Sequence, residues 1–175
     1  TNLHFALQDY LCRNYEGEIH ISTGMTTRSE IESIVRFYEE RGRAKDVVLY
    51  SCTSGYPVAF EDVCLLEIKR FADTYGDRVK AIAFSGHHLG IAVDIAAVTL
   101  GAKWVERHFT LDRTWKGTDH AASLEPDGLR RLCRDIHHVS MALKYKDQDI
   151  LDVEDVQRKK LKWQLQEPAV LRAAQ

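Results

Sequence analysis

The sequence predicts an α/β fold built from four consecutive strand–helix units with parallel strands. Four short runs rich in Val, Ile and aromatic residues alternate with amphipathic helical patterns. The strand ends fall at Ser22, Ser51, Ser85 and His108, so successive ends are 29, 34 and 23 residues apart. This period is typical of β/α units. A closed (β/α)8 barrel needs eight units and about 250 residues. The chain therefore forms either a small open sheet or half of a barrel.

The strands are expected to be buried on both faces, because their apolar character is nearly continuous. They are Glu18–Ile21, Asp46–Leu49 with Tyr50, Val79–Phe84, and Lys103–Val105 continuing through Glu106–Phe109. The expected helices are Leu3–Asn14, Arg28–Arg41, Asp62–Tyr75, Gly90–Leu100, Pro126–Leu143 and Val153–Leu165. Small apolar residues fill almost all of Gly90–Leu100, so that helix is expected to be buried.

Composition limits the class of protein. The 175 residues are 45% hydrophobic and carry a net charge of -2. We expect one globular domain at residues 1–150 and a helical tail at 151–175. The near-neutral charge argues against a nucleic-acid partner. No run approaches the roughly 20 apolar residues of a membrane span, and no signal peptide is recognisable at the start. The four cysteines are interpreted as buried, reduced thiols of a cytoplasmic protein.

Polar residues follow every expected strand. In parallel α/β folds, the site is built where the carboxyl ends of the strands meet. Hydroxyl donors beside helix N-termini suit phosphate or carboxylate, although each residue alone also fits a helix cap or a turn. These hydroxyl residues are Ser22, Thr23, Ser51, Thr53, Ser54 and Ser85.

Two histidines at neighbouring strand ends, His87 and His108, suggest a metal site. Imidazole is a common ligand of divalent ions, and two such ligands leave positions open for water and substrate. The alternative is a pair of hydrogen-bonded histidines. A long loop at residues 112–126 also favours function over a simple connection. It contains Lys116, which would suit an anion, and Asp119; a solvated loop is the alternative.

Five motifs occur together in the chain. They are STGM at Ser22–Met25, CTSGYP at Cys52–Pro57, SGHHLGIA at Ser85–Ala92, ERHFTLD at Glu106–Asp112 and GTDHAASLEP at Gly117–Pro126. In this order, the set resembles the sialic acid synthases, the NeuB-type enzymes. These enzymes condense phosphoenolpyruvate with N-acetylmannosamine or its 6-phosphate and release phosphate. The resemblance extends from about residue 19 to residue 143.

The resemblance implies a (β/α)8 barrel with an active-site divalent ion, usually Mn²⁺, with Mg²⁺ or Co²⁺ as alternatives. It implies His87 and His108 as metal ligands. The positions matched to phosphoenolpyruvate are Ser22, Ser54 and Ser85. Tyr56 and Asp119 match positions that contact the amino-sugar acceptor and are the candidate catalytic residues. Lys116 joins the substrate-binding candidates.

The resemblance also implies that this chain corresponds to the last four units of the barrel. The earlier strands of the family carry a catalytic Glu and a Lys that holds phosphoenolpyruvate, so we expect the chain alone to be inactive. Exposed strand edges predict that it is unstable or associates, and the full-length form is expected to be a homodimer. Three alternatives remain: a synthase of a related nonulosonic acid, another metal-dependent aldolase or lyase on the same barrel, and a non-catalytic chain.

Overall fold

A computed structural model describes residues 2–163. The chain divides into two compact units, one ending at Leu143 and one beginning at Lys144. The first unit therefore ends somewhat before residue 150, the expected end of the globular domain. Within the second unit, the described residues contain helix α6 (Asp152–Leu161). None of the helices in residues 2–163 is long and apolar enough to cross a membrane.

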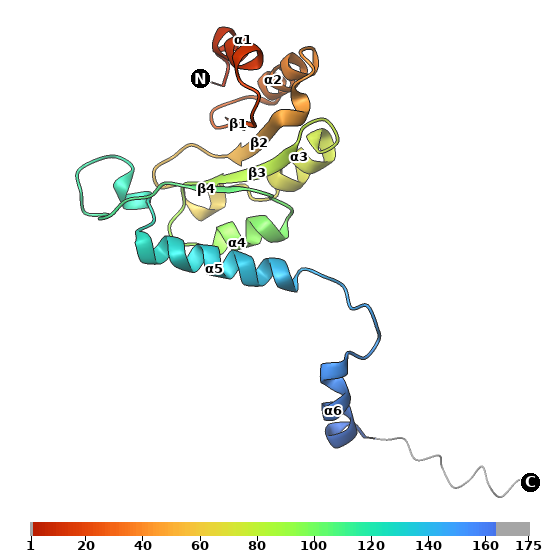
Figure 1. The fold of residues 1–175 in the computed structure, drawn as a ribbon. Coiled ribbons are helices and arrows are strands. Elements are labelled where there is room, and N and C mark those ends of the chain that lie inside the picture. The colour runs from red at the N-terminus through yellow and green to blue at the C-terminus, as the bar shows by residue number, and fades with distance from the viewer. Residues whose placement is uncertain (1, 164–175) are drawn as a thin grey trace, which may run out of the picture. The chain divides into compact units, whose positions relative to one another are not determined.

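A parallel sheet forms the centre of the first unit (Figure 1). In residues 2–163 it contains four strands in the order β1 (Ile19–Ser22), β2 (Val47–Cys52), β3 (Ala81–Gly86) and β4 (Val105–Arg107). Every neighbouring pair is parallel. The sheet curls as half a barrel, with helices between successive strands, which confirms the predicted fold class. Strands β1 and β4 are its two edges.

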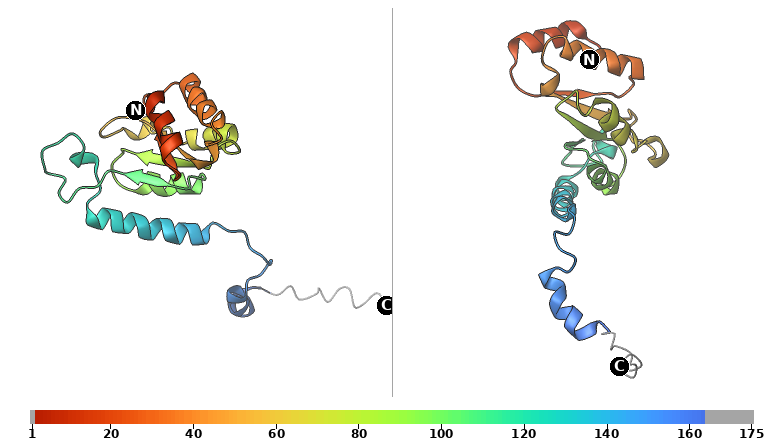
Figure 2. Two further views of the ribbon diagram at one scale, coloured as in Figure 1. Left: turned by 45° about the horizontal axis from the view of Figure 1, so that its top comes forward. Right: turned by 90° about the vertical axis from the view of Figure 1, so that its right-hand side faces the viewer.

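Helices occur where the sequence predicts them, with small shifts at their ends except at the start of α3. The helices of this unit are α1 (Phe5–Asn14), α2 (Arg28–Glu39), α3 (Glu67–Tyr75), α4 (Ala92–Thr99) and α5 (Pro126–Ala142). Views from other directions show α1 beside α2, and α4 beside α5 (Figure 2). The start of α2 is fixed by a capping box: Glu30 Oε2 accepts from the Thr27 amide at 2.7 Å, and Thr27 Oγ1 accepts from the Glu30 amide at 3.3 Å.

Helix α3 begins later than Asp62, the residue predicted to start it. A short 3₁₀ turn, Phe60–Asp62, takes the first part of that segment. Cys64 then has φ of +51°, a left-handed conformation that an α-helix cannot continue. The apolar spacing of the segment is helical throughout, so the sequence pattern gave no indication of this break.

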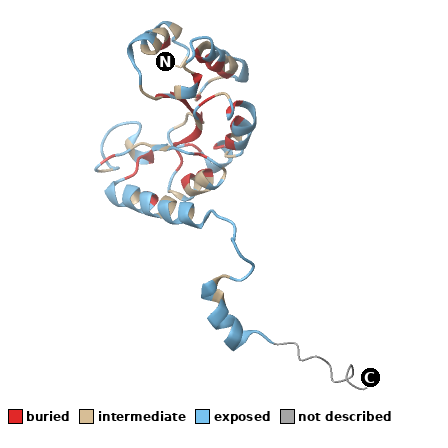
Figure 3. Ribbon diagram, turned by 45° about the vertical axis from the view of Figure 1, so that its right-hand side comes forward, coloured by how far each residue is buried: buried red, intermediate tan, exposed pale blue. Residues whose placement is uncertain are grey.

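The two faces of the sheet differ in chemistry. Alternate strand residues point outward to the helices, where Ile21, Leu49 and Phe84 pack in the main core with Ile34 and Tyr38 of α2. Figure 3 shows these buried segments between the sheet and its helices. The inner face has only a small apolar cluster of Val48, Tyr50 and Ala83. Polar residues occupy the remaining inner positions, so a binding or catalytic site is expected on this face.

Two expectations about burial were wrong. In α4, only Asp94 and Ala97 are buried, although the whole helix was expected to be. One side of this helix packs on the sheet while α5 covers the other only in part. The cysteines were expected to be buried, but Cys64 and Cys133 are exposed, and the other two are half-buried.

A surface network anchors the turn before β3. The Arg78 guanidinium donates to both carboxylate oxygens of Glu32 and both of Glu39, at 2.8–2.9 Å. These bonds hold the pKa of both carboxyls below their ordinary value of 4.5. The network therefore contributes stability above pH 4.5 and loses it as the pH falls and the carboxylates become protonated.

We expect Arg78→Ala to lower the free energy of unfolding by about 1 kcal/mol at pH 7, since partly exposed ion pairs are weakened by solvent. The difference from the unaltered chain should shrink as the pH falls below about 4.5. Urea unfolding at several pH values measures it. Arg70→Ala, which removes a single exposed pair with Glu67, is the control. A pH-independent difference would mean that the carboxylates are not involved.

Candidate active site

The carboxyl ends of the strands bring polar side chains together on the inner face of the sheet. Ser85, on β3, donates a hydrogen bond to Glu106 Oε1, on β4, at 2.9 Å. His87 and His108 come directly after these two strands, each two residues beyond Ser85 and Glu106. Because side chains alternate between faces in a strand, all four belong to one face. The predicted meeting of polar strand ends is therefore present.

His87 is nearly buried, at 6% exposed, and is held by the end of β2. Its Nδ1 lies 3.2 Å from the carbonyl oxygen of Thr53 and 4.0 Å from the Cys52 thiol sulfur. The hydrogen bond with Cys52 raises the pKa of His87 above its ordinary value, although burial opposes the shift. An Nδ1–H that donates to the Thr53 carbonyl fixes the ring orientation and leaves Nε2 as the free lone pair.

Cys52 occupies the same corner. Burial acts to raise the pKa of its thiol, but hydrogen bonding with His87, Ser22 and Ser85, together with the charge of His87, outweighs burial, and the net shift is downward. The thiol therefore lies beside three of the predicted site residues. Its contact with the His87 ring supports the orientation set by the Thr53 carbonyl.

The two predicted metal ligands lie in contact, edge to face. The ring centroids of His87 and His108 are 5.0 Å apart, with the planes at 85°. Tyr56 lies against both rings, 4.6 Å from His87 and 5.5 Å from His108 between centroids. Asp119 Oδ2 lies 3.6 Å from His108 Nδ1. Four of the predicted site residues, from three separate segments, thus form one cluster.

This cluster fits a divalent ion with open positions. Each imidazole turns Nδ1 toward a protein oxygen, which leaves Nε2 for a ligand bond. Within residues 2–163, no group of three or more His, Cys, Asp or Glu side chains is arranged to hold a metal. Two nitrogen donors alone would leave most coordination positions to water and substrate, as a catalytic ion requires.

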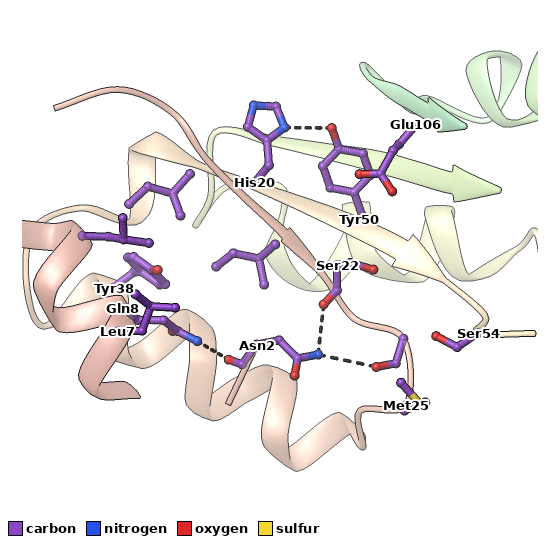
Figure 4. A pocket seen from close by; sticks show the side chains of 14 residues that line it. Asn2, Leu7, Gln8, His20, Ser22, Met25, Tyr38, Tyr50, Ser54 and Glu106 are labelled. Atoms are coloured by element: carbon purple, nitrogen blue, oxygen red, sulfur yellow. Dashed lines mark hydrogen bonds between the residues drawn. The ribbon is translucent and has the colours of Figure 1, made fainter. Parts of the chain in front are cut away.

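The other predicted substrate residues are more dispersed. Ser22 and Ser54 line a cavity of about 410 Å³ beside β1, together with Tyr50 and Glu106 (Figure 4). Gly24 permits the loops after β1 and β2 to approach, because a Cβ there would collide with the Ser54 hydroxyl. Lys116 is exposed in the loop between β4 and α5. No hydrogen bond or ion pair joins it to another candidate in the part of the chain that the structure describes.

Glu106 was not among the residues singled out from the sequence. It is an inner-face carboxylate that lines the cavity and accepts from Ser85. Its position two residues before His108 on one strand was the signal that could have identified it. His20, on the same face, has its Nδ1 2.8 Å from the Tyr50 hydroxyl.

Comparison with known proteins supplies the family. The model of the NeuB family matches residues 2–148. This chain belongs to the NeuB family. The match covers every strand described above and the whole cluster around His87 and His108.

The chain is similar to named synthases of sialic and related acids. It is 40% identical over 141 residues to the human N-acetylneuraminate-9-phosphate synthase, which covers 81% of this chain and 38% of the relative. It is 37% identical over 127 residues to an N,N'-diacetyllegionaminic acid synthase of Campylobacter jejuni, covering 72% of this chain and 37% of the relative. The chain therefore spans less than two fifths of the length of these relatives.

Solved structures agree on the fold. A sialic acid synthetase from Leptospira borgpetersenii, in complex with citrate, superposes with a TM-score of 0.73 at 26% identity. The superposition covers 91% of this chain and 56% of that one. A spore coat polysaccharide biosynthesis protein from Bacillus subtilis also gives a TM-score of 0.73, at 29% identity, over 81% of this chain and 39% of that one.

Proposed function

We propose that this chain supplies the metal- and acceptor-binding half of a synthase that condenses phosphoenolpyruvate with N-acetylmannosamine or its 6-phosphate. The product is a sialic acid or a related nonulosonic acid, and phosphate is released. The observation that carries the proposal is the cluster in which the His87 and His108 rings meet edge to face, with centroids 5.0 Å apart, beside Tyr56 and Asp119. The names of the relatives support the same reaction class.

His87 and His108 would hold a divalent ion, for which we propose Mn²⁺. When bound, such an ion supplies Lewis-acid polarisation of the acceptor aldehyde. The chain's own contribution is orientation: the Thr53 carbonyl holds the His87 ring through Nδ1, Asp119 lies 3.6 Å from His108 Nδ1, and Tyr56 packs against both rings. The near burial of His87 also restricts the approach of water from its side.

Hydroxyl groups on the inner face are proposed to bind phosphoenolpyruvate. Ser22 and Ser54 line the 410 Å³ cavity, and Ser85 lies next to it through its bond to Glu106. Neutral donors of this kind bind phosphate and carboxylate oxygens without introducing a charge. Lys116, in the exposed loop, would add a cation if the loop closes over the substrate.

The acceptor is proposed to lie against Tyr56 and Asp119. A half-exposed carboxylate beside His108 suits the binding of sugar hydroxyls and the transfer of a proton. The match to the human 9-phosphate synthase favours a 6-phosphorylated acceptor, and the similarity to a legionaminic acid synthase keeps a related sugar as the second candidate. We also propose a cytoplasmic homodimer, and we expect residues 1–175 alone to be inactive.

Phosphate release tests this proposal. The longest natural form of the protein that contains residues 1–175 is incubated with Mn²⁺, phosphoenolpyruvate and one of four acceptors: N-acetylmannosamine, mannose, or the 6-phosphate of either. We expect acceptor-dependent phosphate release, which chelation of the ion abolishes. Aldehyde cleavage or addition without consumption of phosphoenolpyruvate would instead indicate a different aldolase or lyase. Absence of all these activities would favour a non-catalytic chain.

We expect Asp119→Asn to lower turnover about a hundredfold, because an amide cannot exchange the proton that a carboxylate can. Measurement of kcat and KM for the acceptor separates proton transfer from binding, since loss of a binding contact alone would raise KM. Asp127→Asn is the control, because this carboxylate pairs only with arginines on the surface of α5. Equal kcat in the two variants would remove Asp119 from the chemistry.

A further inference from the structure

A second cluster of polar side chains lies on the opposite, helix-facing side of the sheet. Asp94 of α4 is fully buried, and Arg107 at the end of β4 is 2% exposed. Arg107 Nη1 lies 2.5 Å from Asp94 Oδ2 and 3.3 Å from His88 Nε2, and His88 is itself fully buried. Asp94 Oδ2 is 3.4 Å from the same ring nitrogen. These three side chains are called the buried triad below.

The buried triad is bonded to the backbone that carries the two metal-ligand candidates. The Arg107 guanidinium donates to the carbonyl oxygen of His88 at 2.7 Å and to that of Gly90 at 2.8 Å. His88 follows His87 directly, and Arg107 directly precedes His108. One guanidinium thus connects the segment after β3 to the end of β4.

This connection begins where the sheet itself stops. The β3–β4 ladder ends with Gly86 opposite Arg107. The next pair in register would be His87 and His108, which the ladder does not hold. A Cβ on Gly86 would come within 3.0 Å of Asp94 Oδ1 and 2.9 Å of His88 Cε1, so the triad lies tightly against the last rung. The triad therefore continues the link between the two strands past the final pair.

The triad is poorly arranged for stability alone. His88 Nδ1, Asp94 Oδ1 and Arg107 Nε are buried without a hydrogen-bond partner among the described residues. A partly satisfied buried network is less favourable than apolar side chains of similar volume. Apolar residues would fill the space between α4 and the sheet at least as well, so a different role accounts better for three polar groups in this place.

We propose that His88, Asp94 and Arg107 are positioning residues that hold the His87 and His108 rings at their metal-binding separation. This inference rests on the proposed function for its metal, but the geometry that it concerns belongs to the chain alone. Side-chain alternation places His88 and Arg107 on one face of the sheet and the two rings on the other, and Asp94 meets the first pair from α4. The guanidinium acts on the rings through the backbone rather than by contact.

The test replaces both charges together in the variant Asp94→Leu/Arg107→Met, so that no unpaired charge remains buried. Two quantities are measured: the nuclear Overhauser effect between the ring protons of His87 and His108, and the dissociation constant for Mn²⁺. We expect the variant to unfold cooperatively, to lose the ring–ring effect, and to bind Mn²⁺ about 10- to 100-fold more weakly. Ile82→Val, which removes a methyl group from the helix-facing core, should change neither quantity.

Unchanged ring contacts and unchanged Mn²⁺ affinity in the folded double variant would overturn the inference. If the double variant does not fold, Arg107→Lys decides, because an ammonium keeps the charge but lacks the planar fork that spans two carbonyls. Weaker Mn²⁺ binding by a folded lysine variant supports positioning, and normal binding opposes it. If the unaltered chain binds no Mn²⁺, the proposed function is wrong. The nuclear Overhauser effect between the two rings, compared in the unaltered chain and the double variant, still tests whether the triad positions them.

Discussion

His108→Ala is expected to weaken Mn²⁺ binding by more than about 100-fold and to abolish metal-dependent phosphate release. Only two nitrogen donors converge in this cluster, so one imidazole cannot retain the ion that both would hold. The substitution also removes the neighbour of Tyr56 and Asp119. The expected loss therefore exceeds that of any substitution that acts on the cluster from outside.

Isothermal titration with Mn²⁺ measures the binding of residues 1–175 directly, and phosphate release measures the longer natural form. His138→Ala is the matched control, because this histidine is exposed on α5, away from the strand ends. Thermal unfolding should be nearly unchanged in both variants, since the His108 side chain is partly exposed. Full activity and retained affinity in His108→Ala would remove the metal assignment.

The fold followed from local pattern to a large extent. Runs such as Asp46–Tyr50 and the helical spacing of Arg28–Arg41 are set by burial and periodicity, which a sequence displays directly. The break before α3 was missed because it depends on the left-handed conformation of Cys64, and nothing in the apolar spacing marks that residue. The partial exposure of α4 was missed because apolar composition does not say how much of a helix its neighbours cover.

The site was predictable where chemistry and topology coincide. His87 and His108 follow neighbouring parallel strands, so their convergence follows from the fold, and their rings meet edge to face. The metal itself remains a prediction. Asp119 reaches His108 only because the loop after β4 returns to it through the bridge between Phe109 and Leu124. Such a return depends on tertiary contacts that residue spacing does not express.

The buried triad could not be predicted from its three residues taken one at a time. His88 directly follows the metal-ligand candidate His87 and is fully buried on the opposite side of the sheet. Asp94 lay in a segment interpreted as apolar, and Arg107 in a motif valued for the histidine beside it. Each polar residue is unremarkable alone. Only the packing of α4 against the β3–β4 edge of the sheet brings the Asp94 carboxylate and the Arg107 guanidinium to 2.5 Å from each other.

We expect Asp94→Ala to lower the free energy of unfolding by about 3–5 kcal/mol, because it leaves the Arg107 charge buried without its carboxylate. Asp94→Leu/Arg107→Met should cost far less, about 1 kcal/mol or none, since it removes both charges and fills the space with apolar atoms. Urea unfolding measures both. The difference between the two losses in unfolding free energy is the informative result. If Asp94→Ala only created a cavity, its loss would match the volume removed and would not depend on the Arg107 charge.

Arg78→Ala provides the surface reference, since it removes a guanidinium bonded to two carboxylates in contact with water. If Asp94→Ala costs no more than Arg78→Ala, water must reach the Arg107 charge. The triad would then be too loosely held to fix the two rings. If the double variant is instead as unstable as Asp94→Ala, the ion pair itself stabilises the fold. A large single loss with a small double loss is the pattern expected of a buried pair that contributes geometry more than stability.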